Sequence, residues 1–368
     1  MKPTILIPGI QGTTLVNTNT LDFDTIWSGI QSKYESIYDL ALKEDTQYDD
    51  MPRAIIERSD VEDLAYKNAF YIIKNMIGGS VYIFGYDWRK SCVENGKRLK
   101  EYVDHLKGKL GIDQFNFLTH SMGGMVLSCY LNLLNGNYDV IKHAILTVCP
   151  FKGSIHALIG LIKGEGGIKF PFLNSNDEFR KIARTFPSVY ELCPTYQGAI
   201  DFDTSNPLFG IGLFDIYNSE HWQSNLSQDS LFKVRLKELK LFQKTNSMLD
   251  LSLLPDETKG RFLIVAGRGE DTRVSVIVEK KGPKEKVNNF FNFDRPKGDG
   301  DGTVPLQSST LYKDDILTLT VESKWHDKAT HAFFLNDGRV QAIIKRFLKD
   351  ETNTTEWWSD AVGSVEKV

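Results

Sequence analysis

A serine about one third of the way along the sequence, Ser121, lies where a strand is expected to turn directly into a helix. The apolar run at residues 115–118 leads into Thr119-His-Ser-Met-Gly-Gly124, and an apolar segment of helical length follows at once. A serine on such a strained turn presents its hydroxyl above the sheet, where the positive end of the helix faces a developing oxyanion. Thr119 replaces the first glycine of the G-x-S-x-G pattern, and a capping serine at an ordinary junction is the structural alternative. The pattern favours Ser121 as a nucleophile in acyl transfer.

A serine nucleophile needs a histidine base and an acid that orients it, and on this kind of sheet the acid precedes the histidine. The loop Asp299-Gly-Asp-Gly-Thr-Val-Pro305 supplies the acid. We favour Asp301 over Asp299, because Asp301 directly precedes Gly-Thr-Val-Pro, where the loop returns to ordered structure. Asp271, just after the apolar run at residues 261–266, is the alternative acid. A solvated Asp-Gly turn is the structural alternative.

Two histidines follow Asp301, and their surroundings differ. His331 lies between the expected last strand and the expected last helix, where this kind of fold presents its base. His326 lies closer to the strand, between a tryptophan and an aspartate, which favours a surface or packing role. The order of the residues therefore predicts a triad of Ser121, Asp301 and His331.

An oxyanion formed during acyl transfer needs two backbone donors. One is the amide of Met122, directly after the nucleophile, and the other comes from the loop after an early strand. Pro8-Gly-Ile-Gln-Gly12 follows the first apolar run, and we select Ile10 as its donor. A plain Pro-Gly turn is the structural alternative. This chemistry requires no metal and no organic cofactor.

The segments around these residues alternate between strand-like and helix-like patterns. Short apolar runs predict strands, and apolar positions at helical spacing predict helices between them. Strands are expected at residues 4–7, 81–84, 115–118, 143–148, 261–266 and 316–321, and helices at residues 61–76, 92–110, 123–134 and 338–348. This order predicts an α/β-hydrolase fold: a mostly parallel central sheet flanked by helices, with an inserted cap or lid subdomain.

The stretch from residue 155 to residue 254 interrupts the alternation. It is rich in glycine, phenylalanine and proline, has one expected helix at residues 230–248, and is typical of an insertion rather than a second sheet. We expect an N-terminal core at residues 1–154 with a short lid-like insert at about 17–58, a cap at 155–254, a C-terminal core at 255–349, and a loose polar tail at 350–368.

Composition limits the partners of the chain. Its 368 residues are 41% hydrophobic and 25% charged, and the formal net charge of −4 gives no reason to expect nucleic acid. Basic clusters at residues 233–244 and 280–286 are typical of solvated faces. The four cysteines form neither a zinc motif nor a disulfide framework, and no apolar run is long enough to span a bilayer. No signal peptide is apparent, so we expect a cytoplasmic protein with peripheral membrane contact.

Together the motifs resemble those of the lecithin–cholesterol acyltransferase family. The matching segments, in the order of the family, are Ile7-Pro-Gly-Ile-Gln-Gly12, Tyr86-Asp-Trp-Arg89, Thr119-His-Ser-Met-Gly-Gly124, Pro150-Phe-Lys-Gly-Ser154, Pro187-Ser-Val-Tyr-Glu-Leu192, Gly298-Asp-Gly-Asp-Gly-Thr-Val-Pro305 and His331. Tyr86-Asp-Trp-Arg89 is the most distinctive, because a generic hydrolase does not need it. Thr119 agrees with the family, which often lacks the first glycine.

The resemblance implies the same triad and the same oxyanion donors, Ile10 and Met122. It makes residues 155–254 the cap over an acyl-chain pocket, and residues 17–48, with Trp27, the lid and membrane-contact region. Asp87 and Arg89 are expected to brace the loops beneath the site. The lid region is short and has no paired cysteines, unlike the secreted animal members, which favours a bacterial or intracellular relative.

The function that these features predict is a serine hydrolase or O-acyltransferase that cleaves acyl esters of lipids through an acyl-enzyme, as phospholipases and lipases do. Its partner is a lipid or other acyl-ester substrate. A soluble short-chain carboxylesterase is one alternative. A non-catalytic binding or sensing module on the same fold is another, since fold alone does not decide function.

Overall fold

The computed structural model describes most of the chain. The described residues are 1–17, 25–28, 40–42, 55–61, 63–164, 176–202, 215–222, 224–278, 291–323, 330–358 and 365–368. His326 and parts of the lid and cap regions lie outside them.

A seven-stranded sheet of the described residues forms the centre of the molecule, in the order β13-β12-β9-β7-β6-β1-β5. Its strands are β1 (Thr4–Ile7), β5 (Val81–Ile83), β6 (Phe115–His120), β7 (Ile141–Thr147), β9 (Phe262–Arg268), β12 (Thr318–Glu322) and β13 (Val365–Lys367). Neighbours pair in parallel except β13, which is antiparallel to β12. The expected mostly parallel sheet is therefore confirmed.

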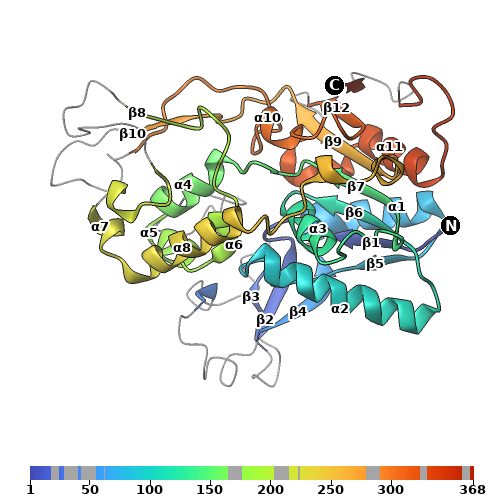
Figure 1. Ribbon diagram of the computed structural model, residues 1–368, viewed down its shortest axis with the longest axis horizontal. Helices are drawn as coiled ribbons and strands as arrows, with labels where there is room; N and C mark the ends of the chain where they lie inside the picture. The colour runs from blue at the N-terminus through green and yellow to red at the C-terminus, as the bar shows by residue number, and fades with distance from the viewer. Residues whose placement is uncertain are drawn as a thin grey trace.

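Helices cover both faces of this sheet (Figure 1). They are α1 (Asn68–Ile77), α2 (Cys92–Leu110), α3 (Met122–Asn132) and α11 (Gly338–Leu348). Along β1, Ile5 and Ile7 join the apolar layer that contains α2 and α3, while Leu6 joins the layer of α1 and α11. Strands buried on both faces are apolar at most positions, which explains the nearly continuous apolar runs of the sequence.

The segment expected to form the cap is built mainly from helices in its described residues, which lie beside the sheet (Figure 1). Its helices are α4 (Ile155–Lys163), α5 (Asn176–Ala183), α6 (Pro187–Glu191), α7 (Ser224–Ser227) and α8 (Ser230–Lys244). A small sheet of β8 (Ile200–Phe202), β10 (Val276–Val278) and β11 (Phe291–Asn292) joins the cap to the C-terminal core. The sequence predicted α8 alone and no sheet, because the other elements are too short for a clear periodicity.

The region between β1 and α1 contains a second small sheet. The strands β2 (Thr13–Asn17), β3 (Thr25–Trp27) and β4 (Ile55–Val61) pair antiparallel in the order β3-β2-β4. The helix predicted at residues 61–76 begins later than expected. Strand β4 continues to Val61, a π-helical turn η3 follows at Asp63–Lys67, and α1 starts at Asn68.

The C-terminal tail is not loose where the structure describes it. Strand β13 extends the edge of the central sheet, and Trp357 is buried against Phe347 of α11. The sequence did not predict these contacts, because the tail is polar and a single edge strand needs few apolar residues.

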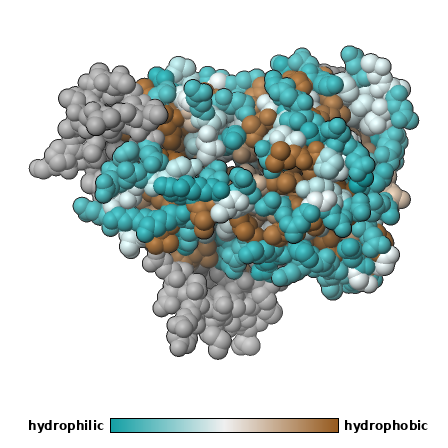
Figure 2. Space-filling view, in the orientation of Figure 1, coloured by the Kyte–Doolittle hydropathy of each residue, from teal (hydrophilic) through white to brown (hydrophobic). Residues whose placement is uncertain are grey.

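The surface of the described residues is largely hydrophilic in the view of Figure 2, with scattered apolar patches. On α8 the basic residues Lys233, Lys237 and Lys240 lie on the exposed face, as expected for a solvated cluster. In the part of the chain that the structure describes, no helix combines the length and apolarity needed to cross a membrane.

Candidate active site

Ser121 lies at the junction of β6 and α3 in a strained conformation. Its backbone has φ 54° and ψ −129°, and its side chain is 5% exposed. The two glycines after Met122 have no room for a side chain. A Cβ at Gly123 would clash with the Ile7 carbonyl, and one at Gly124 would lie 2.5 Å from Cys149 Sγ. The same Cβ at Gly124 would meet Thr119 Oγ1 at 3.2 Å. Gly124 therefore lies where any side chain would crowd Cys149 and Thr119.

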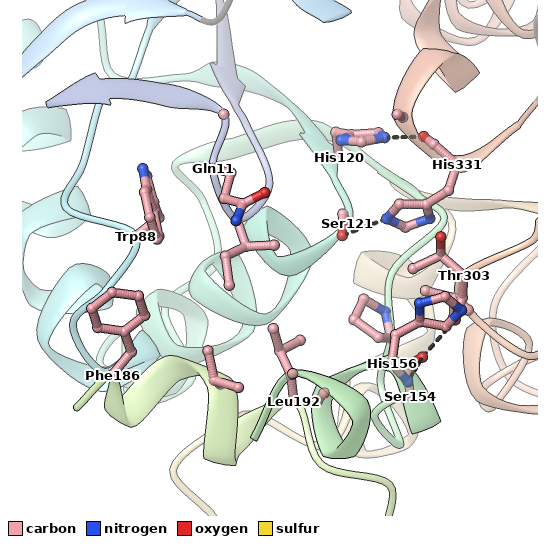
Figure 3. A pocket seen from close by; sticks show the side chains of 18 of the residues that line it. Gln11, Trp88, His120, Ser121, Ser154, His156, Phe186, Leu192, Thr303 and His331 are labelled. Atoms are coloured by element: carbon pink, nitrogen blue, oxygen red, sulfur yellow. Dashed lines mark hydrogen bonds between the residues drawn. The ribbon is translucent and has the colours of Figure 1, made fainter. Parts of the chain in front are cut away.

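His331 joins Ser121 to Asp301. Its Nε2 lies 2.9 Å from Ser121 Oγ, and its Nδ1 lies 2.7 Å from Asp301 Oδ2. Figure 3 shows the imidazole directed at the serine. The other carboxylate oxygen, Oδ1, accepts hydrogen bonds from the amides of Thr303 (2.9 Å) and Val304 (2.7 Å). The two backbone amides thus fix Asp301 through Oδ1, and Oδ2 is left to bind His331.

The other acid candidates lie apart from this series. Asp271 is 84% exposed and forms an ion pair with Lys297 at 3.6 Å. Asp299 accepts a hydrogen bond from the Gly269 amide at 2.6 Å, which holds its loop. The structure therefore brings Asp301 to His331. His326, the alternative base, is outside the described residues.

The loop after β1 forms a tight turn that fixes the Ile10 amide. The Gly12 amide donates to the Gly9 carbonyl at 3.0 Å, and Gln11 has a positive φ of 62°. In a trans peptide the N–H points opposite to the C=O, so the Ile10 N–H points away from this turn. The Met122 amide is the first of α3 and has no partner within the helix. Both predicted oxyanion donors therefore belong to backbone segments fixed beside Ser121.

Three side chains from two segments hold carbonyl oxygens of this loop and of the β2 residue that follows it. Tyr86 Oη donates to the Pro8 carbonyl at 2.7 Å, Trp27 Nε1 to the Gln11 carbonyl at 3.1 Å, and Trp88 Nε1 to the Thr13 carbonyl at 3.0 Å. Each bond fixes a peptide plane near the Ile10 amide. The distinctive Tyr86-Asp-Trp-Arg89 segment thus supports the loop through Tyr86 and Trp88, whereas the sequence analysis expected bracing by Asp87 and Arg89 alone.

Trp27 was expected in the lid, in contact with substrate or membrane. It is instead fully buried, with its ring 5.3 Å from that of Trp88 in an edge-on arrangement. It is not among the described residues that line the pocket. Trp27 therefore lies behind the oxyanion loop, and not in an exposed lid that contacts substrate or membrane.

Asp87 and Arg89 form a buried ion pair that joins three parts of the fold. Arg89 Nε and Nη2 reach the two oxygens of Asp87 at 2.8 and 2.6 Å, and Nη1 donates to the Leu40 carbonyl at 2.9 Å. The Arg89 carbonyl accepts from the amide and hydroxyl of Ser188 in α6. Burial opposes ionisation of Asp87, but the charge and hydrogen bonds of Arg89 outweigh it and lower the pKa of Asp87.

Arg89→Met is expected to reduce the free energy of unfolding by about 3–5 kcal/mol, because it leaves the Asp87 carboxylate buried without its partner. Urea unfolding followed by circular dichroism measures this loss. Lys100→Met, which removes the exposed ion pair with Asp104, is the control and should change stability by less than about 1 kcal/mol. Equal losses in the two variants would contradict a bracing role for Arg89.

A cavity of about 290 Å³ opens beside Ser121 and His331. Its walls are mostly apolar and come from the core, from α4 and from α6 (Figure 3). Trp88, Phe186 and Leu192 line one side, and His156 of α4 approaches from the cap. Burial, followed by the charges of His331 and Arg273, lowers the pKa of His156, so this histidine is neutral at neutral pH. No sequence motif marks His156 or Phe186.

Glu191 links the cap to the core at the first turn of α2. Its carboxylate accepts hydrogen bonds from Ser91 Oγ at 2.5 Å and from the Cys92 amide at 2.7 Å. Burial raises the pKa of Glu191 to about 7, although these hydrogen bonds act in the opposite direction. Between pH 4.5 and about 7, the folded protein therefore holds a proton on Glu191 that the unfolded chain has already released.

The contribution of Glu191 to stability is expected to fall as the pH rises from 4.5, its ordinary pKa, to about 7. Glu191→Gln cannot titrate, so the stability of wild type relative to this variant should fall by about 3 kcal/mol across that range. Thermal unfolding at several pH values measures the difference. Glu94→Gln, on the exposed side of α2, is the control. A wild-type-to-Gln difference that is independent of pH would contradict this assignment.

Comparisons with known proteins show which family and which solved structures this chain resembles. The family model for lecithin:cholesterol acyltransferase matches residues 77–253. Among curated proteins, "Lecithin-cholesterol acyltransferase-like 4" of Arabidopsis thaliana is 24% identical, with 95% of this chain and 75% of that protein aligned. "Phospholipase A(1) LCAT3" of the same plant is 23% identical, with 74% of this chain and 66% of that protein aligned.

Among solved structures, the crystal structure of the Tle4–Tli4 complex contains a chain with a TM-score of 0.60 at 14% identity, covering 98% of this chain and 99% of that one. The strand order, the covering helices and the serine at the β6–α3 turn define an α/β-hydrolase fold. Within it, the chain is similar to the lecithin:cholesterol acyltransferase family, the family that its motifs resemble. The fold and this similarity support an acyl-ester hydrolase or acyltransferase.

Proposed function

We propose that the protein cleaves acyl esters of lipids through an acyl-enzyme formed on Ser121. His331 is the general base, Asp301 orients it, and the amides of Ile10 and Met122 bind the oxyanion. The observation that carries this proposal is the hydrogen-bonded series from Asp301 through His331 to Ser121, beside an apolar cavity.

In the first half of the reaction, Ser121 Oγ attacks the ester carbonyl carbon while its proton passes to His331 Nε2. The carbonyl electrons move to the oxygen, which the two amides stabilise. The tetrahedral intermediate then collapses. The bond to the alcohol oxygen breaks, His331 returns its proton to that oxygen, and the acyl group remains on Ser121.

In the second half, water or a lipid alcohol attacks the acyl-enzyme and loses its proton to His331. Collapse of the second intermediate releases a fatty acid or a new ester, and the proton returns to Ser121. Hydrolysis and transacylation use the same residues. They differ in whether water or the lipid alcohol reaches the acyl carbon.

The walls of the cavity support a lipid as the acyl donor. Ala157, Gly160 and Ala183 are small, and together with Phe179 and Phe186 they give an apolar space suited to a hydrocarbon chain. The ester would lie at the polar end, beside Ser121 and His331. The family, and the curated relative described as a phospholipase A(1), support the same substrate class. Peripheral contact with a lipid surface is part of the proposal.

The test is incubation with vesicles of mixed phospholipid and diacylglycerol, with mass spectrometry of free fatty acid and of newly acylated acceptor. We expect one or both products from the wild type and neither from Ser121→Ala. If only soluble short-chain esters react, the lipid assignment is wrong and a carboxylesterase is indicated. If no ester reacts, the chain is a binding or sensing module.

A further inference from the structure

A hydrogen-bonded chain of two buried side chains connects the oxyanion loop to the backbone of His331. The Gly9 amide donates to Tyr66 Oη at 2.9 Å. Tyr66 Oη lies 2.6 Å from His120 Nδ1, and His120 Nε2 lies 2.8 Å from the His331 carbonyl oxygen, the contact drawn in Figure 3. Tyr66 and His120 are each 4% exposed.

The donor and acceptor capacities of these groups fix the direction of each hydrogen bond in this series. The His331 carbonyl can only accept, so His120 Nε2 carries the hydrogen that it donates. In a neutral imidazole Nδ1 is then the acceptor, and Tyr66 is the donor to it. Tyr66 Oη in turn accepts from the Gly9 amide. Burial, followed by the charge of His331, lowers the pKa of His120 to about 3, so the neutral form that this direction requires is present at neutral pH.

The segment that carries Tyr66 is itself tied to the loop of His331. Tyr66 lies in the π-helical turn η3, and such turns occur frequently at functional sites. The Ala65 carbonyl accepts a hydrogen bond of 2.7 Å from Asn336 Nδ2, in the 3₁₀ helix η6 (His331–Asn336) that begins with His331. Two independent contacts therefore connect η3 to the base.

The opposite end of the chain acts on the oxyanion loop. Gly9 directly precedes Ile10, and a Cβ on Gly9 would lie 2.8 Å from Ser121 Cβ, so this backbone passes close to the nucleophile. Tyr66 holds the Gly9 amide while Tyr86 holds the Pro8 carbonyl of the same peptide group. That peptide plane cannot rotate without breaking both bonds.

We propose that Tyr66 and His120 are positioning residues that set the oxyanion loop and the catalytic histidine at a fixed separation around Ser121. The inference rests on the proposed function and adds a role for two residues that the triad does not use. Neither touches the reacting atoms. They act through Gly9 on the Ile10 amide, and through the His331 carbonyl on the imidazole.

Tyr66→Phe keeps the ring and removes the hydroxyl that joins the two ends. We expect kcat for a soluble p-nitrophenyl ester to fall between about 10-fold and about 100-fold, since a small misplacement of catalytic groups has effects of this size. KM should change by less than about twofold, because the acyl cavity is intact. Tyr102→Phe is the matched control: it removes a hydroxyl that donates to the Ile83 carbonyl at the other side of the sheet.

Variants at His120 separate positioning from general structural support. His120→Gln keeps one acceptor and one donor and should retain more kcat than His120→Phe, which keeps neither. If the two residues act as one unit, Tyr66→Phe combined with His120→Phe should be no slower than His120→Phe alone. If the losses of kcat in the two single variants multiply in the double variant, Tyr66 and His120 do not act as one unit.

Two readouts keep the inference distinct from the proposed function. Nitrogen-15 NMR of histidine side chains should show His120 as the neutral Nε2–H tautomer, whether or not the protein turns over an ester. If wild type hydrolyses esters and Tyr66→Phe keeps kcat within about twofold of Tyr102→Phe, the positioning role is wrong and the proposed function stands. If wild type hydrolyses no ester, both are wrong.

Discussion

Ser121→Ala is expected to reduce kcat for a p-nitrophenyl ester by about 10⁶-fold, to the residual rate that binding and the oxyanion donors alone support. The reason is that the variant has no oxygen to attack the carbonyl, so no acyl-enzyme forms. His331→Ala should cause a loss of similar size, because the serine then lacks the base 2.9 Å from its Oγ. Steady-state kinetics on folded, purified variants measure both.

Ser128→Ala is the matched control for this prediction. Ser128 is another buried serine of α3, and its hydroxyl donates to the Gly124 carbonyl rather than to His331. This variant, and His326→Ala, should keep most of the activity. Retention of turnover in Ser121→Ala would contradict the nucleophile, and a loss confined to His326→Ala would reassign the base.

Asp301→Asn is expected to reduce kcat by about 10⁴-fold while the fold stays intact. The two backbone amides at Oδ1 will hold the amide oxygen of the asparagine in that place, so its NH₂ faces His331 Nδ1. Nδ1 must then accept a hydrogen bond, and the ring hydrogen moves to Nε2. An imidazole in this tautomer cannot take the proton from Ser121.

Asp271→Asn provides the comparison, because Asp271 is exposed and ion-paired at the surface. It should leave kcat within about twofold of wild type. A mild effect at Asp301 together with a severe one at Asp271 would move the acid to the other position. Thermal unfolding of both variants shows whether a loss of activity reflects a loss of structure.

Much of the site could be predicted because the fold constrains its order along the chain. The apolar strand before Ser121 and the helix after it require a sharp turn, and a nucleophile on that turn requires an acid and then a histidine downstream. The hydrogen-bonded contacts of Asp301, His331 and Ser121 have the geometry that this order implies. Their catalytic roles remain predictions until the variants are measured.

What the sequence did not reveal depends on contacts between distant segments. Tyr66 has no motif around it, and its partners Gly9 and His120 lie 57 and 54 residues away. Trp27 is aromatic in a lid-like segment, a pattern that fits an exposed anchor and a buried donor equally well. Its hydrogen bond to Gln11 decides between them, and that bond exists only in the folded chain.

The most direct test of the account is covalent labelling of the wild type with a fluorophosphonate, followed by peptide mass spectrometry to locate the adduct. We predict a single adduct on Ser121, formed far more slowly in His331→Ala and Asp301→Asn. A folded wild type that stays unlabelled, or an adduct on a different serine, would contradict the proposed nucleophile.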